Sequence, residues 1–312
     1  MSLKKMLPRN DIQRIVASWG APGSLTAAQS NWPTSFSRDI VPIPCHSHND
    51  YWRKAPLYDA LAAGCTGVEA DVWLANGNKE LYVGHSQGSL TRERTLKTLY
   101  LDPLFAILSH QNQNTSFSQN TDMSNGIFDT SPRASLTLLI DIKTEGEVTF
   151  PIINEQLQSL RDRGWLTYTN GSNRHPGPIT VVSTGNTPFN LLVSNITYRD
   201  IFFDAPLNEL WSGDSEPSNA SLFDSQNSFY ASTSFRESIG KPWHGMLSPQ
   251  QTETIRGQIR MARQRGLKAR YWDTPSWPIS LRNRIWNLLE REGVGMLNVD
   301  DVVAASHRVW TR

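Results

Sequence analysis

The sequence predicts an α/β fold, a (β/α)8 TIM barrel with an extra β-hairpin strand after the second barrel strand. The first observation is a rhythm in which short runs rich in β-branched residues alternate with longer helix-like stretches, as in βαβ units. The second is that several of these runs are apolar throughout, which is typical of parallel strands covered on both faces. The length of 312 residues suits one such barrel.

Nine runs have the length and composition of strands. The second and third are separated only by "ANGNK", which is far too short for a crossover helix. The Asn-Gly pair in this connection is typical of a hairpin turn, so we expect the third run to fold back antiparallel on the second. The other eight then form the barrel. The nine runs are residues 40–45, 67–74, 80–85, 136–143, 179–184, 200–205, 228–233, 269–274 and 295–300.

The stretches between these runs carry helix signals. Ser248 is a good N-cap for the helix that follows it, and Pro103 is a break within a long helical stretch. Several stretches end at a glycine, the residue that most often terminates a helix. The expected helices cover residues 58–64, 89–110, 146–164, 248–266 and 280–293.

We expect a single domain over residues 1–312, because no linker or internal repeat divides the chain. Its core spans about 40–305, and residues 1–38 form an N-terminal extension with a helix at 10–19. One segment, 110–132, is rich in Asn, Ser and Thr. We interpret it as a surface insertion or a mobile lid.

The composition limits the classes of partner. The net charge of +1 gives no strong field for nucleic acid, and no apolar run approaches the eighteen residues of a transmembrane helix. We therefore expect a monomer that binds a small or lipid substrate, with at most a transient contact to a membrane surface. We favour a secreted protein over a cytoplasmic one because the chain has four Asn-x-Ser/Thr sequons. They begin at Asn114, Asn170, Asn195 and Asn219.

The chain has two cysteines, Cys45 and Cys65. On the strand bounds above, Cys45 ends the first strand and Cys65 lies at the beginning of the second. Parallel neighbours would place them at opposite ends of the sheet, too far apart for a disulfide. We therefore expect two free thiols.

Polar side chains gather at the ends of the early strands, where a barrel builds its active site. The stretch "PCHSHNDYW" places His46, His48 and Asn49 after the first strand. Glu69 and Asp71 are two residues apart on the second strand and therefore face the same side.

The following two strands add further groups. The folded-back strand delivers His85, and the next parallel strand carries Asp141 and Lys143, again two apart. Three carboxylates and an amide oxygen suit one hard divalent cation, Mg2+ or Ca2+. The histidines suit proton transfer and the lysine suits an anionic oxygen. Together they indicate metal-assisted attack on a phosphodiester.

Each group also has a simpler interpretation. Asp141 and Lys143 could be a structural ion pair, and a histidine after a strand is commonly a solvated residue. Co-occurrence favours a site, because burying several charges in one barrel costs several kcal/mol per ion unless they are paired or bind a metal.

The motifs "SHNDY", "GVEADVWL", "LYVGHS" and "LYLDPL" resemble the altered inheritance of mitochondria protein 6 family. That family lies within the phospholipase-C-like phosphodiesterase superfamily of TIM barrels, with glycerophosphodiester phosphodiesterases and sphingomyelinase D. The resemblance covers most of residues 40–301, and its specific motifs lie between 45 and 143.

The resemblance implies a role for each candidate residue. His48 and His85 correspond to the catalytic histidines, and Asn49, Glu69 and Asp71 to metal ligands. Asp141 and Lys143 correspond to the Asp-x-Lys pair of the sphingomyelinase D branch. "RYWDT" resembles a late strand of glycerophosphodiesterases and implies that Trp272 lies near the substrate.

The implied activity is hydrolysis of a glycerophosphodiester or a phospholipid head group. A His-Ser-His sequence replaces the His-Arg-Gly opening of glycerophosphodiesterases, so His46 and His48 both stay candidates for the first catalytic position. A cyclic phosphate product, formed by attack of a substrate hydroxyl, is as compatible with these groups as hydrolysis by water. Two rival classes are a zinc-dependent amidohydrolase, which also uses His-x-His, and a non-catalytic ligand-binding barrel.

Overall fold

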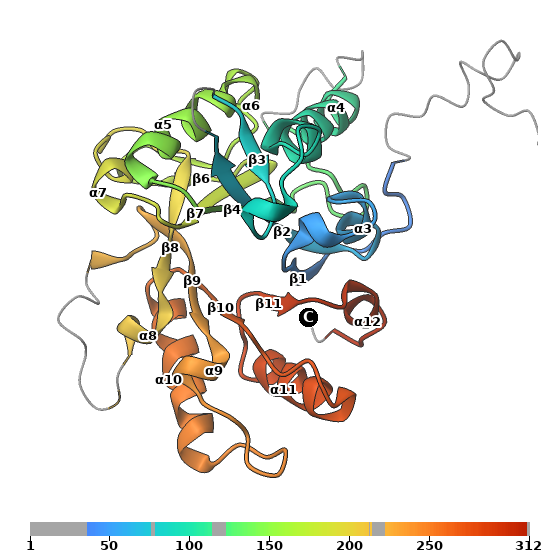
Figure 1. Cartoon of the computed structure of the whole chain (residues 1–312), viewed down its shortest axis with the longest axis vertical. Coiled ribbons are helices and arrows are strands. Elements are labelled where there is room, and N and C mark those ends of the chain that lie inside the picture. The colour runs from blue at the N-terminus through green and yellow to red at the C-terminus, as the bar shows by residue number, and fades with distance from the viewer. Residues whose placement is uncertain (1–35, 76–78, 114–122, 212, 214–221, 311–312) are drawn as a thin grey trace, which may run out of the picture.

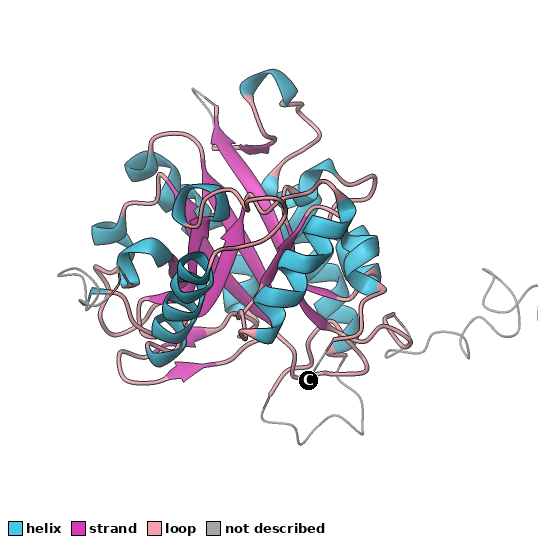
Figure 2. Cartoon of the chain, turned by 90° about the horizontal axis from the view of Figure 1, so that it is seen from below, coloured by secondary structure: helices cyan, strands magenta, loops and turns pink. Residues whose placement is uncertain are grey.

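A computed structural model describes residues 36–75, 79–113, 123–211, 213 and 222–310. Eight parallel strands lie in the order β10-β9-β8-β7-β4-β2-β1-β11. A parallel bridge between Arg270 and Met296 joins the two ends of this order, so the barrel is nearly closed. Figure 1 shows the strands in chain order, and Figure 2 shows them in the centre with helices around them. The predicted TIM-like barrel is confirmed.

The barrel strands match the predicted runs closely except at the first. Their bounds are β1 Ile43–Ser47, β2 Cys65–Leu74, β4 Leu136–Ile142, β7 Ile179–Gly185, β8 Ile201–Pro206, β9 Ser228–Ser234, β10 Lys268–Trp272 and β11 Leu297–Val299. β3 (Leu81–Val83) pairs antiparallel with the end of β2, with Val72 opposite Val83. Residues 76–78 of the connection lie outside the described residues.

Helices cover the outside of the barrel. α10 begins after Ser248, whose side chain accepts a hydrogen bond from the backbone of Gln251 in a capping box. The expected helix 89–110 begins only at Lys97, with one π-helical stretch before α4. The helices are α3 Tyr58–Ala62, η3 Lys97–Leu101, α4 Asp102–Gln111, α5 Gly146–Gln156, α6 Gln158–Asp162, α7 Phe189–Leu192, α8 Leu207–Leu210, α9 Phe235–Ser238, α10 Pro249–Gln264, α11 Ile279–Arg291 and α12 Val302–Ser306.

The described residues also contain two short 3-10 helices and two short strands. η1 (Asp50–Trp52) follows β1, and η2 (Gln87–Ser89) follows β3. β5 (Tyr168–Thr169) and β6 (Arg174–His175) form a separate two-stranded sheet before β7. The helix expected at 10–19 lies outside the described residues.

Side chains alternate along each strand between two environments. Those that point outward form the large core beneath the helices. The inward side chains near the amino end form a small apolar cluster of Leu139, Val182, Phe202, Phe229, Tyr230 and Met296. Above this cluster the inward positions are polar, so the chemistry collects at the carboxyl end.

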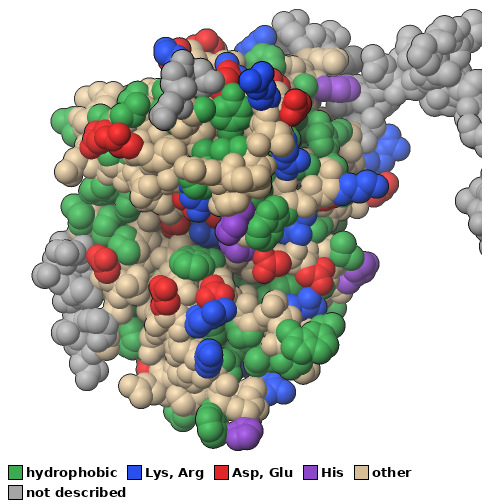
Figure 3. Space-filling view, viewed as in Figure 1, with side chains coloured by type: hydrophobic (Ala, Val, Ile, Leu, Met, Phe, Trp, Pro, Cys, Tyr) green, Lys and Arg blue, Asp and Glu red, His purple; other side chains and the backbone are tan. Residues whose placement is uncertain are grey.

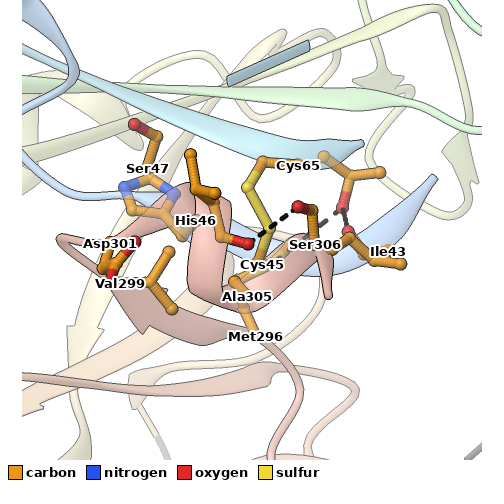
Figure 4. The surroundings of a disulfide bond; sticks show 12 residues. Ile43, Cys45, His46, Ser47, Cys65, Met296, Val299, Asp301, Ala305 and Ser306 are labelled. Carbon is orange, nitrogen blue, oxygen red and sulfur yellow. Dashed lines mark hydrogen bonds between the residues drawn. A yellow bond between two sulfur atoms is a disulfide. The ribbon is translucent and has the colours of Figure 1, made fainter. Parts of the chain in front are cut away.

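Cys45 and Cys65 form a disulfide, which contradicts the prediction of free thiols. Their Cα atoms are 4.7 Å apart. The error lay in the strand bounds: β1 extends to Ser47 and β2 begins at Cys65, so Cys45 lies inside β1 beside the first residues of β2. Figure 4 shows the bond next to Ala305 and Ser306 at α12. The disulfide ties the two strands that carry His46 and Glu69.

The polar segment 110–132 does not lie at the mouth of the barrel where the structure describes it. It connects the end of α4 to the start of β4, so its described flanks are at the amino end of the strands. Ile127 and Phe128 are fully buried, and the Ser37 hydroxyl donates to the Ile127 carbonyl oxygen at 2.7 Å. The described flanks are packed elements rather than a lid over the carboxyl end.

Candidate active site

A cleft of about 990 Å3 opens at the carboxyl ends of the barrel strands. Eight of the nine candidate residues line it, and His46 is the exception. Figure 3 shows histidine side chains near the middle of one face, beside hydrophobic side chains and above a mixed group of acidic and basic ones. The eight lining residues are His48, Asn49, Glu69, Asp71, His85, Asp141, Lys143 and Trp272.

Three carboxylates meet at the centre of this cleft. Glu69 and Asp71 point inward from β2, and β4 places Asp141 directly opposite Asp71 in the parallel register. One oxygen from each of the three acids lies within 4.8 Å of the others. Glu69 and Asp71 are buried and Asp141 is partly buried. The expected convergence of the three acids is therefore present.

Lys143 forms ion pairs with two of these acids. Its Nζ atom lies 2.6 Å from Oδ2 of Asp141 and 3.1 Å from Oδ2 of Asp71. Burial, together with the charges of Glu69 and Asp141, raises the pKa of Asp71 to about 7. Burial also raises the pKa of Asp141, although Lys143 opposes the shift. Two carboxylates of the cluster are therefore harder to ionise than ordinary ones.

For Glu69, neighbouring groups lower the pKa by more than burial raises it. Burial alone would raise its pKa, but His46, His48 and Arg270 outweigh burial and hold the pKa well below the usual range. The side-chain nitrogens of these three residues lie 3.8–3.9 Å from Oε2 of Glu69. The Asn49 backbone N–H donates to the same oxygen at 3.2 Å. Glu69 is thus the permanently ionised member of the cluster.

The two histidines of β1 have different environments. His46 is fully buried, and its burial lowers its pKa to about 4. His48 lines the cleft, and its Nδ1 lies 2.7 Å from Oδ1 of Asp300. Burial alone would lower the pKa of His48, but Asp300 and Glu69 reverse the sign and raise it. Only His48 of this pair reaches the cleft.

Asn49 turns the chain sharply after β1. Its φ of 47° and ψ of 45° are left-handed, a conformation that asparagine tolerates better than most residues. The turn starts η1 and brings the Tyr51 hydroxyl to 2.6 Å from Oδ1 of Asn49 and 2.8 Å from Oδ2 of Asp71. Tyr51 is buried and connects the amide to the acid cluster.

His85 lies at the rim, just beyond β3. Its Nδ1 is 3.3 Å from the Tyr51 hydroxyl and 3.8 Å from Oδ2 of Asp71. Its ring packs against Trp52 with centroids 4.9 Å apart. The side chain is 56% exposed, so it can reach a ligand in the cleft.

Several charged residues of the cleft were missed in the sequence, and two of them, Arg270 and Asp204, are buried. Arg270 on β10 is buried, donating from Nε to Ser232 at 2.9 Å and from Nη1 to Asn298 at 2.8 Å. Its Nη2 lies 3.5 Å from Oδ2 of Asp204 on β8. The two-residue spacing that predicted a shared face for Glu69 and Asp71 also applies to β10. Arg270 is two residues before Trp272, so both side chains point to the same side of that strand.

The lining of the cleft also includes apolar and basic side chains. Trp272, which is 37% exposed, lies there with Phe235, Trp277 and Leu281. Arg236 and Lys241 line the same cleft. The cleft therefore has an acidic centre and an apolar wall.

The acid cluster fits a hard divalent cation. Within the described part of the chain, Oδ1 of Asp71 and Oδ1 of Asp141 are buried without a hydrogen-bond partner. Carboxylate oxygens are the ligands that Mg2+ and Ca2+ prefer. The metal-ligating cluster found among the described residues contains no histidine or cysteine, which disfavours zinc.

The barrel and this cleft define the class of protein: a TIM-like barrel with acidic groups and histidines converging at the carboxyl ends of its strands. A family model described as the AIM6-like phosphodiesterase domain matches residues 34–204. The chain belongs to the altered inheritance of mitochondria protein 6 family, and the resemblance seen in the sequence is confirmed. The family assignment supports a hydrolase of the phosphodiester type.

Relatives from several fungi match most of the chain. A homologue from Arthroderma benhamiae is 45% identical, over 88% of this chain and 86% of its own length. Members from Eremothecium gossypii and Lachancea thermotolerans are 37% and 33% identical, over 87% and 91% of this chain and 71% of each relative. All three are named altered inheritance of mitochondria protein 6 or its homolog. No solved structure matches the chain.

Among the described residues, no helix combines the length and the apolar character needed to cross a bilayer.

Proposed function

We propose that this chain is a metal-dependent phosphodiesterase that acts on a glycerophosphodiester or a phospholipid head group by histidine general acid–base catalysis. The observation that carries the proposal is the convergence of Glu69, Asp71 and Asp141 within 4.8 Å at the cleft centre. His48 and His85 line the same cleft. This is the arrangement that attack on a phosphodiester requires, with a charged centre between two proton-transfer groups.

The three carboxylates would hold one Mg2+ or Ca2+, with Asn49 as a fourth ligand. Oδ1 of Asn49 already accepts from Tyr51, but a carbonyl oxygen has a second lone pair. The bound cation would supply Lewis-acid polarisation of a phosphoryl oxygen. Lys143 and Arg270 provide fixed positive charge beside the acids and can receive the remaining phosphate oxygens.

His48 and His85 have the positions for proton transfer. Asp300 binds Nδ1 of His48, which leaves Nε2 as the nitrogen on the Glu69 side. His85 approaches from β3, with Tyr51 against its Nδ1. One histidine would take the proton of the attacking hydroxyl and the other would protonate the leaving oxygen. His46, behind Glu69 and outside the cleft lining, would position that carboxylate.

The apolar wall supports a substrate with a nonpolar portion next to its phosphate. Trp272 and Trp277 would contact that portion, and Lys241 lines the same cleft. We propose a monomer that meets a lipid surface only transiently, and a location in the secretory pathway rather than the cytosol. The attacking group would be water or a neighbouring hydroxyl of the substrate, giving an open or a cyclic phosphate.

A direct test is turnover of bis(p-nitrophenyl) phosphate after chelation and re-addition of Mg2+, Ca2+ or Zn2+. We expect activity with Mg2+ or Ca2+, and its loss in Glu69→Gln and Asp71→Asn. Glu155→Gln, an exposed carboxylate in an ion pair with Lys79, is the matched control and should keep full activity. Circular dichroism should show an intact fold in all three variants.

Three outcomes would contradict the proposal. Full turnover in both site variants would place the chemistry elsewhere. Amide hydrolysis with Zn2+ alone would favour the amidohydrolase class, and absence of turnover of phosphodiesters of any size would favour a binding protein. Product analysis by 31P NMR on an active sample would separate hydrolysis from cyclisation.

A further inference from the structure

We propose that Asn170 and Asn195 are sites of N-linked glycosylation on the face of the barrel opposite the cleft. Both begin an Asn-x-Ser/Thr sequon, with Ser172 and Thr197 at the third position. Both asparagines are exposed. The other two sequons lie outside the described residues and form no part of the proposal.

In each asparagine the hydrogen bonds of the side chain are made by its oxygen. Oδ1 of Asn170 accepts from the backbone N–H groups of Ser172 at 3.1 Å and Asn173 at 2.8 Å. Oδ1 of Asn195 accepts from the backbone N–H and the hydroxyl of Thr197, both at 3.0 Å. Within the described residues Nδ2 of neither asparagine donates a hydrogen bond, so the atom that would carry a sugar is free on both.

The two sequons lie side by side. Thr169 and Arg199 exchange backbone hydrogen bonds of 2.8 and 3.1 Å, which pairs the chain before Asn170 with the chain after Asn195. Gly171, at a φ of 85°, passes so close to the Ile196 carbonyl oxygen that a side chain there would collide with it. The middle residues of the two sequons are thus in contact.

An aromatic stack borders both asparagines. The Tyr168 ring stacks on His175 with centroids 4.7 Å apart, and on Tyr198 with centroids 5.3 Å apart. Tyr168 is two residues before Asn170, and Tyr198 is three residues after Asn195. Aromatic faces of this kind can pack against the apolar face of a sugar ring. The first sugar on either asparagine could therefore pack against the rings of this aromatic stack.

The location is compatible with the proposed active site. The β5–β6 hairpin precedes β7 and residues 195–199 precede β8, so both sequons lie at the amino ends of barrel strands. The cleft lies at the carboxyl ends, and neither asparagine lines it. A glycan on this face would leave the cleft open.

The Cys45–Cys65 disulfide is an independent observation that favours folding in the secretory pathway, where sequons are modified. Disulfides persist in oxidising compartments and are rare in the cytosol. Both cysteines are fully buried in the core, so this bond belongs to the folded structure. A chain that folds in an oxidising secretory compartment also meets the enzyme that modifies sequons.

The modification is a group transfer from a lipid-pyrophosphate-linked oligosaccharide. Nδ2 of asparagine forms a bond to the anomeric carbon of the first sugar. The bond from that carbon to the pyrophosphate oxygen breaks, and the lipid pyrophosphate leaves with the electron pair. The amide loses one proton to a base of the transferase, so the side chain remains a neutral amide.

The test uses the protein isolated from the cells that produce it. Enzymatic release of N-glycans in H2(18)O converts a modified asparagine to 18O-labelled aspartate. Peptide mass spectrometry then finds this label at Asn170 and Asn195, and a sample incubated without the enzyme corrects for spontaneous deamidation at Asn170-Gly171. Asn154, exposed but outside a sequon, is the internal control and should stay unconverted. Peptides that contain only unmodified Asn170 and Asn195 would overturn the proposal.

Variants separate the sequon from the local fold. Thr197→Ala should abolish modification of Asn195, whereas Thr197→Ser keeps the hydroxyl and should retain it. Ser172→Ala and Ser172→Thr form the matched pair for Asn170. Modification that persists in both alanine variants would also overturn the proposal. Phosphodiester turnover should be unchanged in all four, because their residues lie away from the cleft, so failure here is distinct from failure of the proposed function.

Discussion

Breaking the Cys45–Cys65 disulfide should lower the free energy of unfolding by about 3 kcal/mol. The two cysteines are 20 positions apart in the chain. In the chain-entropy treatment, a closed loop of that length removes roughly 11 cal/mol/K from the unfolded state, or about 3 kcal/mol at room temperature. Both side chains are fully buried, so replacing them would add a packing loss to this figure. The clean perturbation is therefore reduction of the native sequence rather than substitution.

The assay is urea unfolding followed by tryptophan fluorescence. One sample is oxidised, and the other is unfolded, reduced and refolded with reductant present. The reduced protein should unfold at lower urea, with a slightly steeper dependence because its unfolded chain is more open. Cys45→Ala/Cys65→Ala should give the same midpoint with and without reductant. A difference below about 1 kcal/mol between oxidised and reduced protein would refute the reasoning.

Three further predictions concern the cleft. His85→Ala should lower kcat by roughly two to four orders of magnitude, whereas His175→Ala, outside the cleft, should leave kcat unchanged. A loss below tenfold in His85→Ala would show that His85 does not transfer a proton in the reaction. Asp300→Asn removes a carboxylate that raises the pKa of His48, so the limb of the pH profile of kcat/KM that reports His48 should move to lower pH. An unchanged profile would exclude His48 as the group that titrates in that limb. Arg270→Met should destabilise the fold by about 3–5 kcal/mol at neutral pH, because it leaves Glu69 and Asp204 without their buried cation. The loss in urea unfolding should shrink at acid pH, because without Arg270 the pKa values of these two carboxylates rise and the variant takes up protons there.

The strand pattern predicted most of the barrel, and its one costly error has a specific cause. The first strand was placed at 40–45 because that run is apolar. The strand instead spans Ile43–Ser47, and it includes His46, a polar residue that is buried inside the barrel. Hydrophobicity alone cannot place a polar but inward-facing residue in a strand. The shift moved Cys45 from the end of its strand to the interior and concealed the disulfide.

The sequence predicted those parts of the site in which two functional side chains lie on the same strand. The two-residue spacing of Glu69 and Asp71 places them on one face regardless of the rest of the fold. Arg270 and Asp204 follow the same rule, but their contact depends on how β8 and β10 meet across the barrel. Tyr51 depends on the left-handed turn at Asn49, and no periodic pattern encodes that turn.

The charge balance within the cleft favours the proposed metal site over a structural ion-pair network. Four inward carboxylates lie near one another, and in the described residues the permanently charged partners in contact with them are Lys143 and Arg270. The four are Glu69, Asp71, Asp141 and Asp204. A structural network would match each buried acid with a cation, because an unpaired buried charge costs several kcal/mol. Here burial raises the pKa of three of the four, and one buried oxygen of each of these three, Oδ1 of Asp71, Asp141 and Asp204, has no hydrogen-bond partner in the described part of the chain. If all four were ionised, they would carry two more negative charges than Lys143 and Arg270 neutralise, which equals the charge of one divalent cation. The raised pKa values are what such a surplus produces without a cation, and the cation of the proposed function would neutralise it.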